Sequence, residues 1–279
     1  MAVELPSGKV LRRLTLPADP ENVDARPGVG TAVVVSARAG AATLVSVSTL
    51  RVVKVLHGFG SPHIAAIDPS GRWAYVTDDR RGQLAVISLT SRRVVRKLEV
   101  GAGAHHIAVS PDGSRLWIAL GERARTIAVV DTTKPARPRV VGHVDPLGGA
   151  HDLAFAPGGA RVWVTYDDRS EVAVFDAFSY RRLFTIRAGS PPQHVAFGLR
   201  YVYLTSGNDG TLSILSPETG RLLRTVRVPL GSYNLGLGGS LVLTCSLTHG
   251  KLTELDDRGR LLATVPVAGS TRDVALVVR

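Results

Sequence analysis

The sequence has little cysteine, few aromatic residues and no long apolar run. Its one cysteine, Cys245, excludes an internal disulfide. No run of 18 apolar residues is present, so no membrane-spanning helix is expected. Aromatic residues make up 5% of the chain and do not alternate with basic residues as in proteins that stack bases, so specific nucleic-acid binding is not expected either. Nothing at the start of the chain resembles a signal peptide.

Acidic residues are outnumbered by basic ones, which gives a formal net charge of +11. The arginines and lysines recur near the end of each repeat, on the strand that we expect to form an exposed sheet edge. Positive side chains protect such edges from pairing with other chains. An anionic surface as partner of this Arg-rich face is the alternative interpretation. The residues include Arg92, Arg93, Arg96 and Lys97, then Arg181, Arg182 and Arg187, and then Arg221, Arg224 and Arg227.

The stretch from Ala104 to His143 is the unit that repeats along the chain. Three short apolar runs, IAVS, LWIAL and TIAVV, are followed by a basic, β-branched run, RPRVVGH. Turn residues separate them, as in SPDG from Ser110 to Gly113, and helix caps are absent. This pattern predicts a four-stranded antiparallel meander, whose strands we name A to D in chain order.

Strand A of this unit recurs at about 40-residue intervals, which is typical of a β-propeller. Consecutive starts are 41, 43, 46, 42, 40 and 39 residues apart. Seven starts predict an all-β, seven-bladed propeller of four-stranded blades. Residues 1–279 are expected to form it as a single domain, and the protein is expected to be a monomer. The starts are Asn22, His63, His106, Asp152, His194, Asn234 and Asp273.

The two ends of the chain are predicted to share the closing blade. MAVEL and KVLRRLTL, within residues 1–18, align with strands C and D of the other repeats, and Arg272 to Val278 aligns with strand A. The N- and C-terminal strands would then close the ring in one blade. No strand B is found for that blade.

Strand B carries one large ring at the same position in four repeats, and we expect these rings to fill the wedge between neighbouring blades. They are Tyr75, Trp117, Trp163 and Tyr203. Cys245 aligns with Thr165 and Thr205 on strand B, so it is predicted to be a small core residue.

The pattern HIAVSPDGSRLWIA, TIAVVDT and VV, repeated at about 42 residues, resembles the YVTN-repeat, lactonase-like β-propellers. That family includes surface-layer-associated repeat proteins and 6-phosphogluconolactonase-like enzymes. The resemblance implies a seven-bladed propeller and slightly favours an extracytoplasmic location. It implies no particular activity, because such propellers include hydrolases, binding proteins and members without assigned chemistry.

Five of the eight histidines lie at or one residue before the start of strand A, where a propeller's innermost strand reaches the mouth of the central channel. Loops between strands B and C are acidic and would open on the same face, so this end of the channel is expected to favour a cation. Neutral imidazoles suit copper, zinc or iron, and these divalent transition metals are the candidate cofactors. The predicted metal ligands are His63, His106, His151 and His194.

The other polar residues at this mouth are given different roles. Asp152 and Asp273 are the candidate catalytic residues, as general base or further ligand. Asn22, His105, Asn234 and Tyr233 are candidates for binding a ligand. The alternative is that the histidines only cap the channel through hydrogen bonds to water and backbone.

Three functions stay open from the sequence. The first is a ligand-binding propeller whose His/Asp-lined funnel holds a small molecule or a peptide. The second is a metal-dependent hydrolase, lyase or oxidase built on the histidine cluster. The third is a surface or scaffold protein that uses its Arg-rich face.

Overall fold

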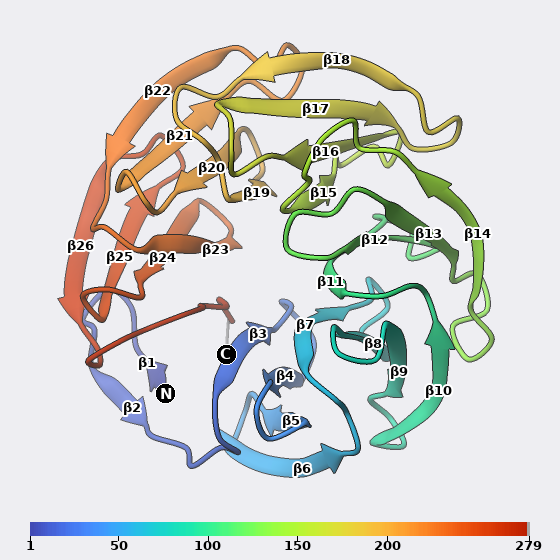
Figure 1. Cartoon of the computed structure of the whole chain (residues 1–279). Coiled ribbons are helices and arrows are strands. Elements are labelled where there is room, and N and C mark those ends of the chain that lie inside the picture. The colour runs from blue at the N-terminus through green and yellow to red at the C-terminus, as the bar shows by residue number, and fades with distance from the viewer. Residues whose placement is uncertain (278–279) are drawn as a thin grey trace.

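The computed structural model describes residues 1–277, and its regular elements are all β-strands. Six four-stranded antiparallel sheets stand around a central channel like the blades of a propeller (Figure 1). Blade 1 consists of β3 (Pro20–Asp24), β4 (Thr31–Ser36), β5 (Ala41–Ser46) and β6 (Arg51–His57). Blade 2 consists of β7 (Pro62–Ile67), β8 (Trp73–Asp78), β9 (Gln83–Ser88) and β10 (Arg93–Glu99). Blade 3 consists of β11 (Ala104–Val109), β12 (Arg115–Leu120), β13 (Ile127–Asp131) and β14 (Arg139–Val144).

The second half of the chain continues the same pattern. Blade 4 consists of β15 (Leu153–Phe155), β16 (Arg161–Thr165), β17 (Glu171–Asp176) and β18 (Arg182–Arg187). Blade 5 consists of β19 (His194–Phe197), β20 (Val202–Ser206), β21 (Thr211–Leu215) and β22 (Leu222–Arg227). Blade 6 consists of β23 (Ser232–Gly238), β24 (Leu241–Ser246), β25 (Lys251–Asp256) and β26 (Leu261–Pro266). The first strand of each blade lines the channel and the fourth lies at the rim. Among residues 1–277 no helix is long and apolar enough to cross a membrane.

The prediction of seven blades is wrong, because residues 1–277 form six four-stranded sheets and not seven. Near the N-terminus, β1 (Ala2–Val3) and β2 (Val10–Arg12) pair only with each other as a two-stranded sheet. Residues 272–277 enter the same space between blades 6 and 1 but form no strand. A seventh four-stranded blade closed by both chain ends is therefore not built: strand B is missing, so nothing bridges β1 to the C-terminal segment.

Apolar contacts still join the two chain ends to blade 6. Val3, Leu5, Val274 and Leu276 pack against a buried cluster that includes Leu243 and Cys245. Cys245 is 2% exposed, and burial raises the pKa of its thiol to about 12. The prediction that it is a core residue is confirmed.

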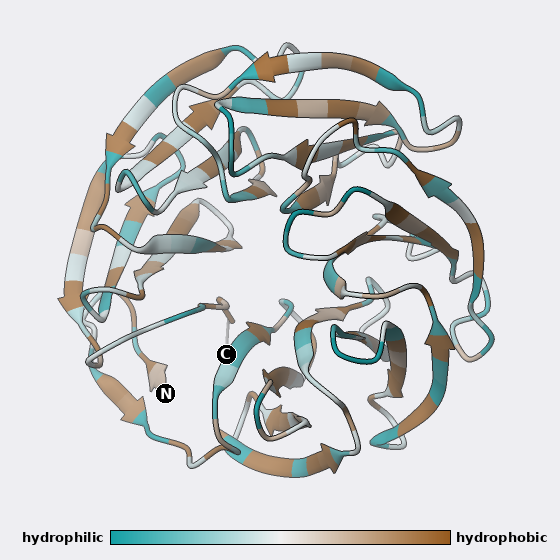
Figure 2. Cartoon of the chain, in the orientation of Figure 1, coloured by the Kyte–Doolittle hydropathy of each residue, from teal (hydrophilic) through white to brown (hydrophobic). Residues whose placement is uncertain are grey.

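The core lies between blades rather than within them. Each neighbouring pair of blades shares one buried apolar cluster, because strands B and C have side chains buried on both faces. The rings predicted to fill these wedges are all 1% exposed or less: Tyr75, Trp117, Trp163 and Tyr203. Apolar residues dominate the middle strands of the blades, such as β16 and β17, whereas the rim strands alternate (Figure 2). The prediction that the four rings are buried between blades is confirmed too.

Turn chemistry ends the strands as the sequence indicates. Gly113 adopts a φ of 73° in the turn after β11, where Ser110 Oγ donates to Asp112 Oδ1 at 2.6 Å. After β13, β17 and β25 an aspartate side chain accepts backbone N–H groups, as when Asp176 Oδ1 accepts from Ser179 N at 2.7 Å. Such hydrogen bonds lower the pKa of Asp176 and fix the tight turn.

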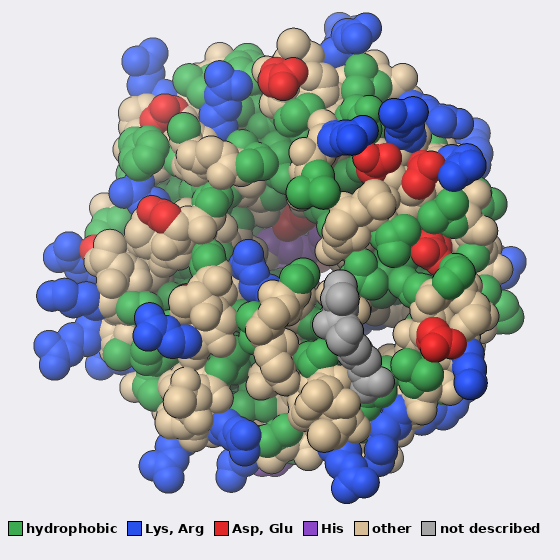
Figure 3. Space-filling model, turned by 180° about the vertical axis from the view of Figure 1, so that it is seen from behind, with side chains coloured by type: hydrophobic (Ala, Val, Ile, Leu, Met, Phe, Trp, Pro, Cys, Tyr) green, Lys and Arg blue, Asp and Glu red, His purple; other side chains and the backbone are tan. Residues whose placement is uncertain are grey.

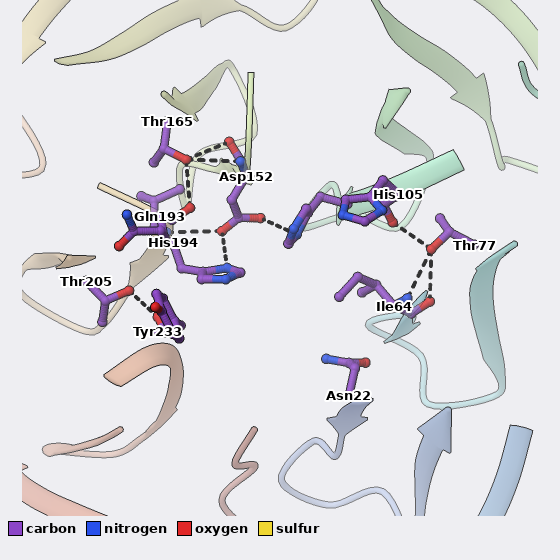
Figure 4. A network of polar contacts seen from close by, with 12 residues as sticks. Asn22, Ile64, Thr77, His105, Asp152, Thr165, Gln193, His194, Thr205 and Tyr233 are labelled. Carbon is purple, nitrogen blue, oxygen red and sulfur yellow. Dashed lines mark hydrogen bonds and ion pairs between the residues drawn. The ribbon is translucent and has the colours of Figure 1, made fainter. Parts of the chain in front are cut away.

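Threonines on strand B tie three of the blades to the next one. Thr77 Oγ1 donates to the carbonyl of His105 at 2.6 Å, and Thr165 Oγ1 donates to the carbonyl of Gln193 at 2.9 Å (Figure 4). Thr205 makes the equivalent bond to the carbonyl of Tyr233. These contacts position the residues that start the next strand A.

Replacing Thr165 by valine keeps the volume of this fully buried side chain but removes its hydroxyl. The carbonyl of Gln193 and the backbone N–H of Asp152 then lose their partner. We expect the free energy of unfolding in urea to fall by about 1–3 kcal/mol. Thr185→Val, on the exposed face of β18, is the matched control and should leave it within about 0.5 kcal/mol. Equal effects of both substitutions would contradict this role for the threonines.

Candidate functional site

Five histidines from four places in the chain meet at one end of the central channel. His63 lies on β7, His105 and His106 on β11, His151 just before β15, and His194 at the start of β19. The His106 ring centroid is 5.4 Å from that of His63, 4.8 Å from that of His151 and 5.1 Å from that of His194. His63 and His105 are stacked, with centroids 3.6 Å apart. We call these five residues the histidine cluster.

Irregular pairing at the start of strand A brings adjacent histidines to the same space. Strict alternation would send His105 and His106 to opposite faces. The register of β11 against β12 shifts between Ala104 and Ile107, and that of β7 against β8 shifts between Pro62 and Ala65. Such bulges re-aim side chains and are frequent beside functional sites. The register shift at β11 therefore lets both His105 and His106 join the cluster.

A carboxylate lies beside the Nδ1 atom of four of the five imidazoles. Glu21 Oε2 is 3.0 Å from His63 Nδ1, and Asp79 Oδ2 is 3.1 Å from His105 Nδ1. The two oxygens of Asp152 are 3.3 Å from His106 Nδ1 and 3.2 Å from His194 Nδ1 (Figure 4). An Nδ1–H that donates to a carboxylate fixes the tautomer in which Nε2 has a free lone pair.

The fifth imidazole offers its other nitrogen. The ring of His151 hydrogen-bonds to the backbone of Glu122, and its buried Nδ1 has no hydrogen-bond partner. A buried polar atom without a partner costs free energy, so such an atom calls for an explanation. A lone pair on Nδ1 directed at a cation would supply one.

Burial keeps three of these imidazoles neutral. Desolvation, followed by the positive potential of a neighbouring imidazole, lowers the pKa of His105 and of His151 to about 4. Desolvation also lowers the pKa of His106 well below its usual range, although Asp152 opposes this shift. Neutral imidazole is the form that binds a metal.

Asp152 is held as a carboxylate between two histidines. Burial disfavours its charge, but His194 and His106 together hold its pKa well below the usual range. One of its oxygens also accepts from the backbone N–H of Val195 at 3.1 Å. Both oxygens are thus engaged, which fits a residue that positions imidazoles. Its predicted role as a general base stays a prediction.

Removing the charge of Asp152 tests that positioning role. In Asp152→Asn one of the two carboxylate oxygens becomes an NH2 donor, so the Nδ1–H of either His106 or His194 faces a donor instead of an acceptor. We expect the apo protein to lose about 3 kcal/mol of unfolding free energy, and Zn(II) affinity to fall about 10–100-fold. Urea denaturation and calorimetric titration measure the two effects. The exposed Asp209→Asn is the control, and an Asp152→Asn variant indistinguishable from it would contradict the assignment.

The other acidic candidate, Asp273, joins the C-terminal segment to blade 1. Its Oδ2 accepts from Asn22 Nδ2 at 2.7 Å and from the backbone N–H of Val23 at 2.9 Å. Burial raises its pKa to about 6. Asn22 Oδ1 in turn accepts from the backbone N–H of Ala65. Asn22 and Asp273 therefore link the C-terminal segment to the inner strands β3 and β7, and their proposed parts in binding and catalysis stay predictions.

Of two further candidates for ligand binding, one lines the channel and the other does not. Asn234 lines the channel and donates from Nδ2 to the carbonyl of Arg272 at 2.8 Å. Tyr233 is not among the residues that line the channel cavity; it packs on Gly207 and donates to Asn208 Oδ1 at 2.8 Å. A ligand in the channel would meet Asn234 rather than Tyr233.

A cavity of about 300 Å³ adjoins the cluster inside the channel. His106, Asp152 and His194 line it together with Asp24, Asp273 and apolar residues of the inner strands. Seen from the face opposite to Figure 1, histidine lies at the floor of the central hollow and Lys and Arg dominate the rim (Figure 3). Cations in the hollow are favoured by the carboxylates at its floor, not by the rim.

Sequence reasoning missed Glu21. Its carboxylate contacts His63 and also lies 3.0 Å from the guanidinium of Arg272. The signal was present, because Glu21 precedes Asn22 just as His105 precedes His106 and His151 precedes Asp152. A second ring, one residue before the first, could have been read from the repeat.

Comparisons with known proteins support a propeller and nothing finer. A family model described as the cytochrome D1 heme domain matches residues 29–123, about a third of the chain. No curated protein matches. Solved structures that are similar include Kuenenia stuttgartiensis hydrazine synthase, with 18% identity, a TM-score of 0.79 and coverage of 95% of this chain and 91% of that chain.

Another similar structure is the β-propeller domain of Myceliophteria thermophila Cps50 (Swd1). Its identity is 12%, its TM-score is 0.76, and the match covers 94% of this chain and 91% of that one. At such identities the likeness shows the fold alone. The chain is thus similar to members of β-propeller families, and its resemblance to the YVTN-repeat group stays a prediction.

Proposed function

We propose that this propeller binds a divalent transition metal through the histidine cluster. The observation that carries the proposal is the set of four Nδ1–carboxylate contacts, 3.0 to 3.3 Å long, which leave Nε2 atoms free. Metal-ligating histidines commonly make this contact, because the carboxylate orients the ring and makes it a stronger ligand. A cluster that only capped the channel would not need one carboxylate contact for each of four rings.

The ligand set indicates which metals would bind. Two groups of three histidines each have ligand atoms within 4.8 Å of one another, so small side-chain movements would bring them around one ion. Imidazole ligands suit copper, zinc and iron. Three protein ligands leave a coordination position open, and an ion so bound could polarise a ligand or lower the pKa of a bound water. The adjoining cavity, at about 300 Å³, would admit a small molecule.

A heme is the second candidate, since the matched family model is described as a heme domain. The part of this chain that it matches, residues 29–123, includes three of the five histidines. The side chains as they stand do not fit it. His63 and His105 stack at 3.6 Å, and His106 lies 5.0 Å from His105, so no flat macrocycle can lie between them. The cluster suits a single ion better than a porphyrin.

The metal content of protein purified without a histidine tag or chelating resin tests the proposal. We expect bound copper, zinc or iron, or tight uptake of Zn(II) or Cu(II) by chelator-treated protein. Hemin added to the same protein should give no absorption band of imidazole-ligated heme. Protein that holds no metal and takes up none would contradict the proposal.

A further inference from the structure

The five imidazoles of the cluster fall into two groups that share His106. The first is His63, His105 and His106, and the second is His106, His151 and His194. Within each group the ligand atoms lie within 4.8 Å of one another. Among residues 1–277 no ring contact joins His63 or His105 to His151 or His194. His106 therefore stands between two outer pairs.

The two outer pairs fall in different groups, so one ion is expected to use only one of them. Zinc lies about 2.0–2.1 Å from an imidazole nitrogen, so two ligands of one ion are at most about 4.2 Å apart. An ion bound by one group leaves two half-buried imidazoles of the other group without a metal to bind. His151 illustrates the cost, because its Nδ1 is already buried and unpartnered.

Carboxylates support each outer pair separately. Glu21 and Asp79 lie beside His63 and His105, whereas Asp152 lies beside His194 and His106. Asp152 is 9% exposed, and its two oxygens lie 3.3 Å from His106 Nδ1 and 3.2 Å from His194 Nδ1. At the other end, Arg272 offsets the charge of Glu21 only, at 3.0 Å. Each end of the cluster thus has negative charge that a cation would offset.

We propose that the cluster holds two transition-metal ions at adjoining positions. One position is formed by His63 and His105 and the other by His151 and His194. His106 completes one of the two through Nε2, because its Nδ1 faces Asp152. This inference rests on the proposed function and adds the number of ions and the division of the ligands between them.

Titration of chelator-treated protein with Cu(II), followed by calorimetry and electron paramagnetic resonance, tests the proposal. We expect two tight equivalents in the wild type. At two equivalents the spectrum should show magnetic coupling between the ions, and at one equivalent or less it should show isolated Cu(II) with nitrogen ligands. The spectrum needs no substitution and is read on the folded wild type.

Paired variants assign the two positions. His63→Ala with His105→Ala, and separately His151→Ala with His194→Ala, should each retain one equivalent and lose the coupled spectrum. The exposed pair His57→Ala with His143→Ala is the control and should retain two. One equivalent in the wild type, or loss of all binding in either cluster variant, would overturn the two-ion arrangement while metal binding itself stood. No binding by the wild type would overturn both.

Discussion

Replacement of His63, His106 and His194 by alanine is expected to weaken binding of Zn(II) and Cu(II) by about 100-fold or more. The loss of even an outer carboxylate partner costs about 10–100-fold in affinity, and here three ligands are removed at once. The three rings meet at one place, with His106 centroids 5.4 Å from His63 and 5.1 Å from His194. Isothermal titration of chelator-treated proteins measures the effect.

The control for this experiment removes histidines without touching the channel. His57 and His143 are exposed on the rim strands β6 and β14, so His57→Ala with His143→Ala should bind metal as the wild type does. Circular dichroism establishes that both variants keep their β-structure. Equal affinity of the triple variant and the wild type would place any metal elsewhere on the molecule.

The apo protein is expected to lose stability steeply as the pH falls from about 6.5 to about 4. The folded-state pKa values of His105 and His151 are about 4, below the value of 6.5 for the unfolded chain. In this window the unfolded chain binds more protons than the folded one, so acid favours unfolding. Each of the two residues accounts for up to about 3 kcal/mol, and His106 acts in the same direction. Above pH 6.5 these groups have no effect.

Urea denaturation of metal-free protein at several pH values between 4 and 8 measures this dependence. Because total stability is about 5–15 kcal/mol, the loss is large enough to unfold the protein near pH 4. A variant with His105→Gln and His151→Gln should show a much flatter profile over the same range, whereas His57→Gln with His143→Gln should keep the wild-type slope. A flat wild-type profile would contradict the burial of neutral imidazoles described above.

Metal binding should extend the stable range to lower pH. The sequence alone predicts that metal affinity falls as pH drops through about 6.5, the ordinary histidine value. Burial lowers the pKa of His105, His106 and His151, so these rings stay ready to bind at a more acidic pH. The fall in affinity is therefore expected below 6.5 rather than at it.

The repeat made much of the architecture predictable from the sequence. The recurrence of strand A at about 40 residues identifies blades 1 to 6, and four of them have the large ring of strand B buried where expected, as at Trp117 and Trp163. The number of strand A patterns in the sequence is not the number of four-stranded sheets, because a blade also needs its other three strands. The seventh start, Asp273, lies in a segment that pairs with no strand, so the seventh blade was predicted in error.

The site was predictable in outline but not in its contacts. Equivalent repeat positions indicate that His63, His106 and His194 meet, and the structure brings them together with Asp152 between two of them. Local register shifts were not foreseeable from alternation, and one of them brings His105 into the cluster. The pairing of Glu21 with His63 joins residues 42 positions apart, on the inner strands of the adjacent blades 1 and 2.

The most direct test of a metal centre at the histidine cluster is X-ray absorption at the metal edge of protein loaded with one equivalent of Zn(II). We predict a first shell dominated by imidazole nitrogen at about 2.0–2.1 Å, with the outer-shell scattering of the ring atoms. A shell of oxygen alone, or a nitrogen shell that persists unchanged in the His63, His106 and His194 triple alanine variant, would contradict it.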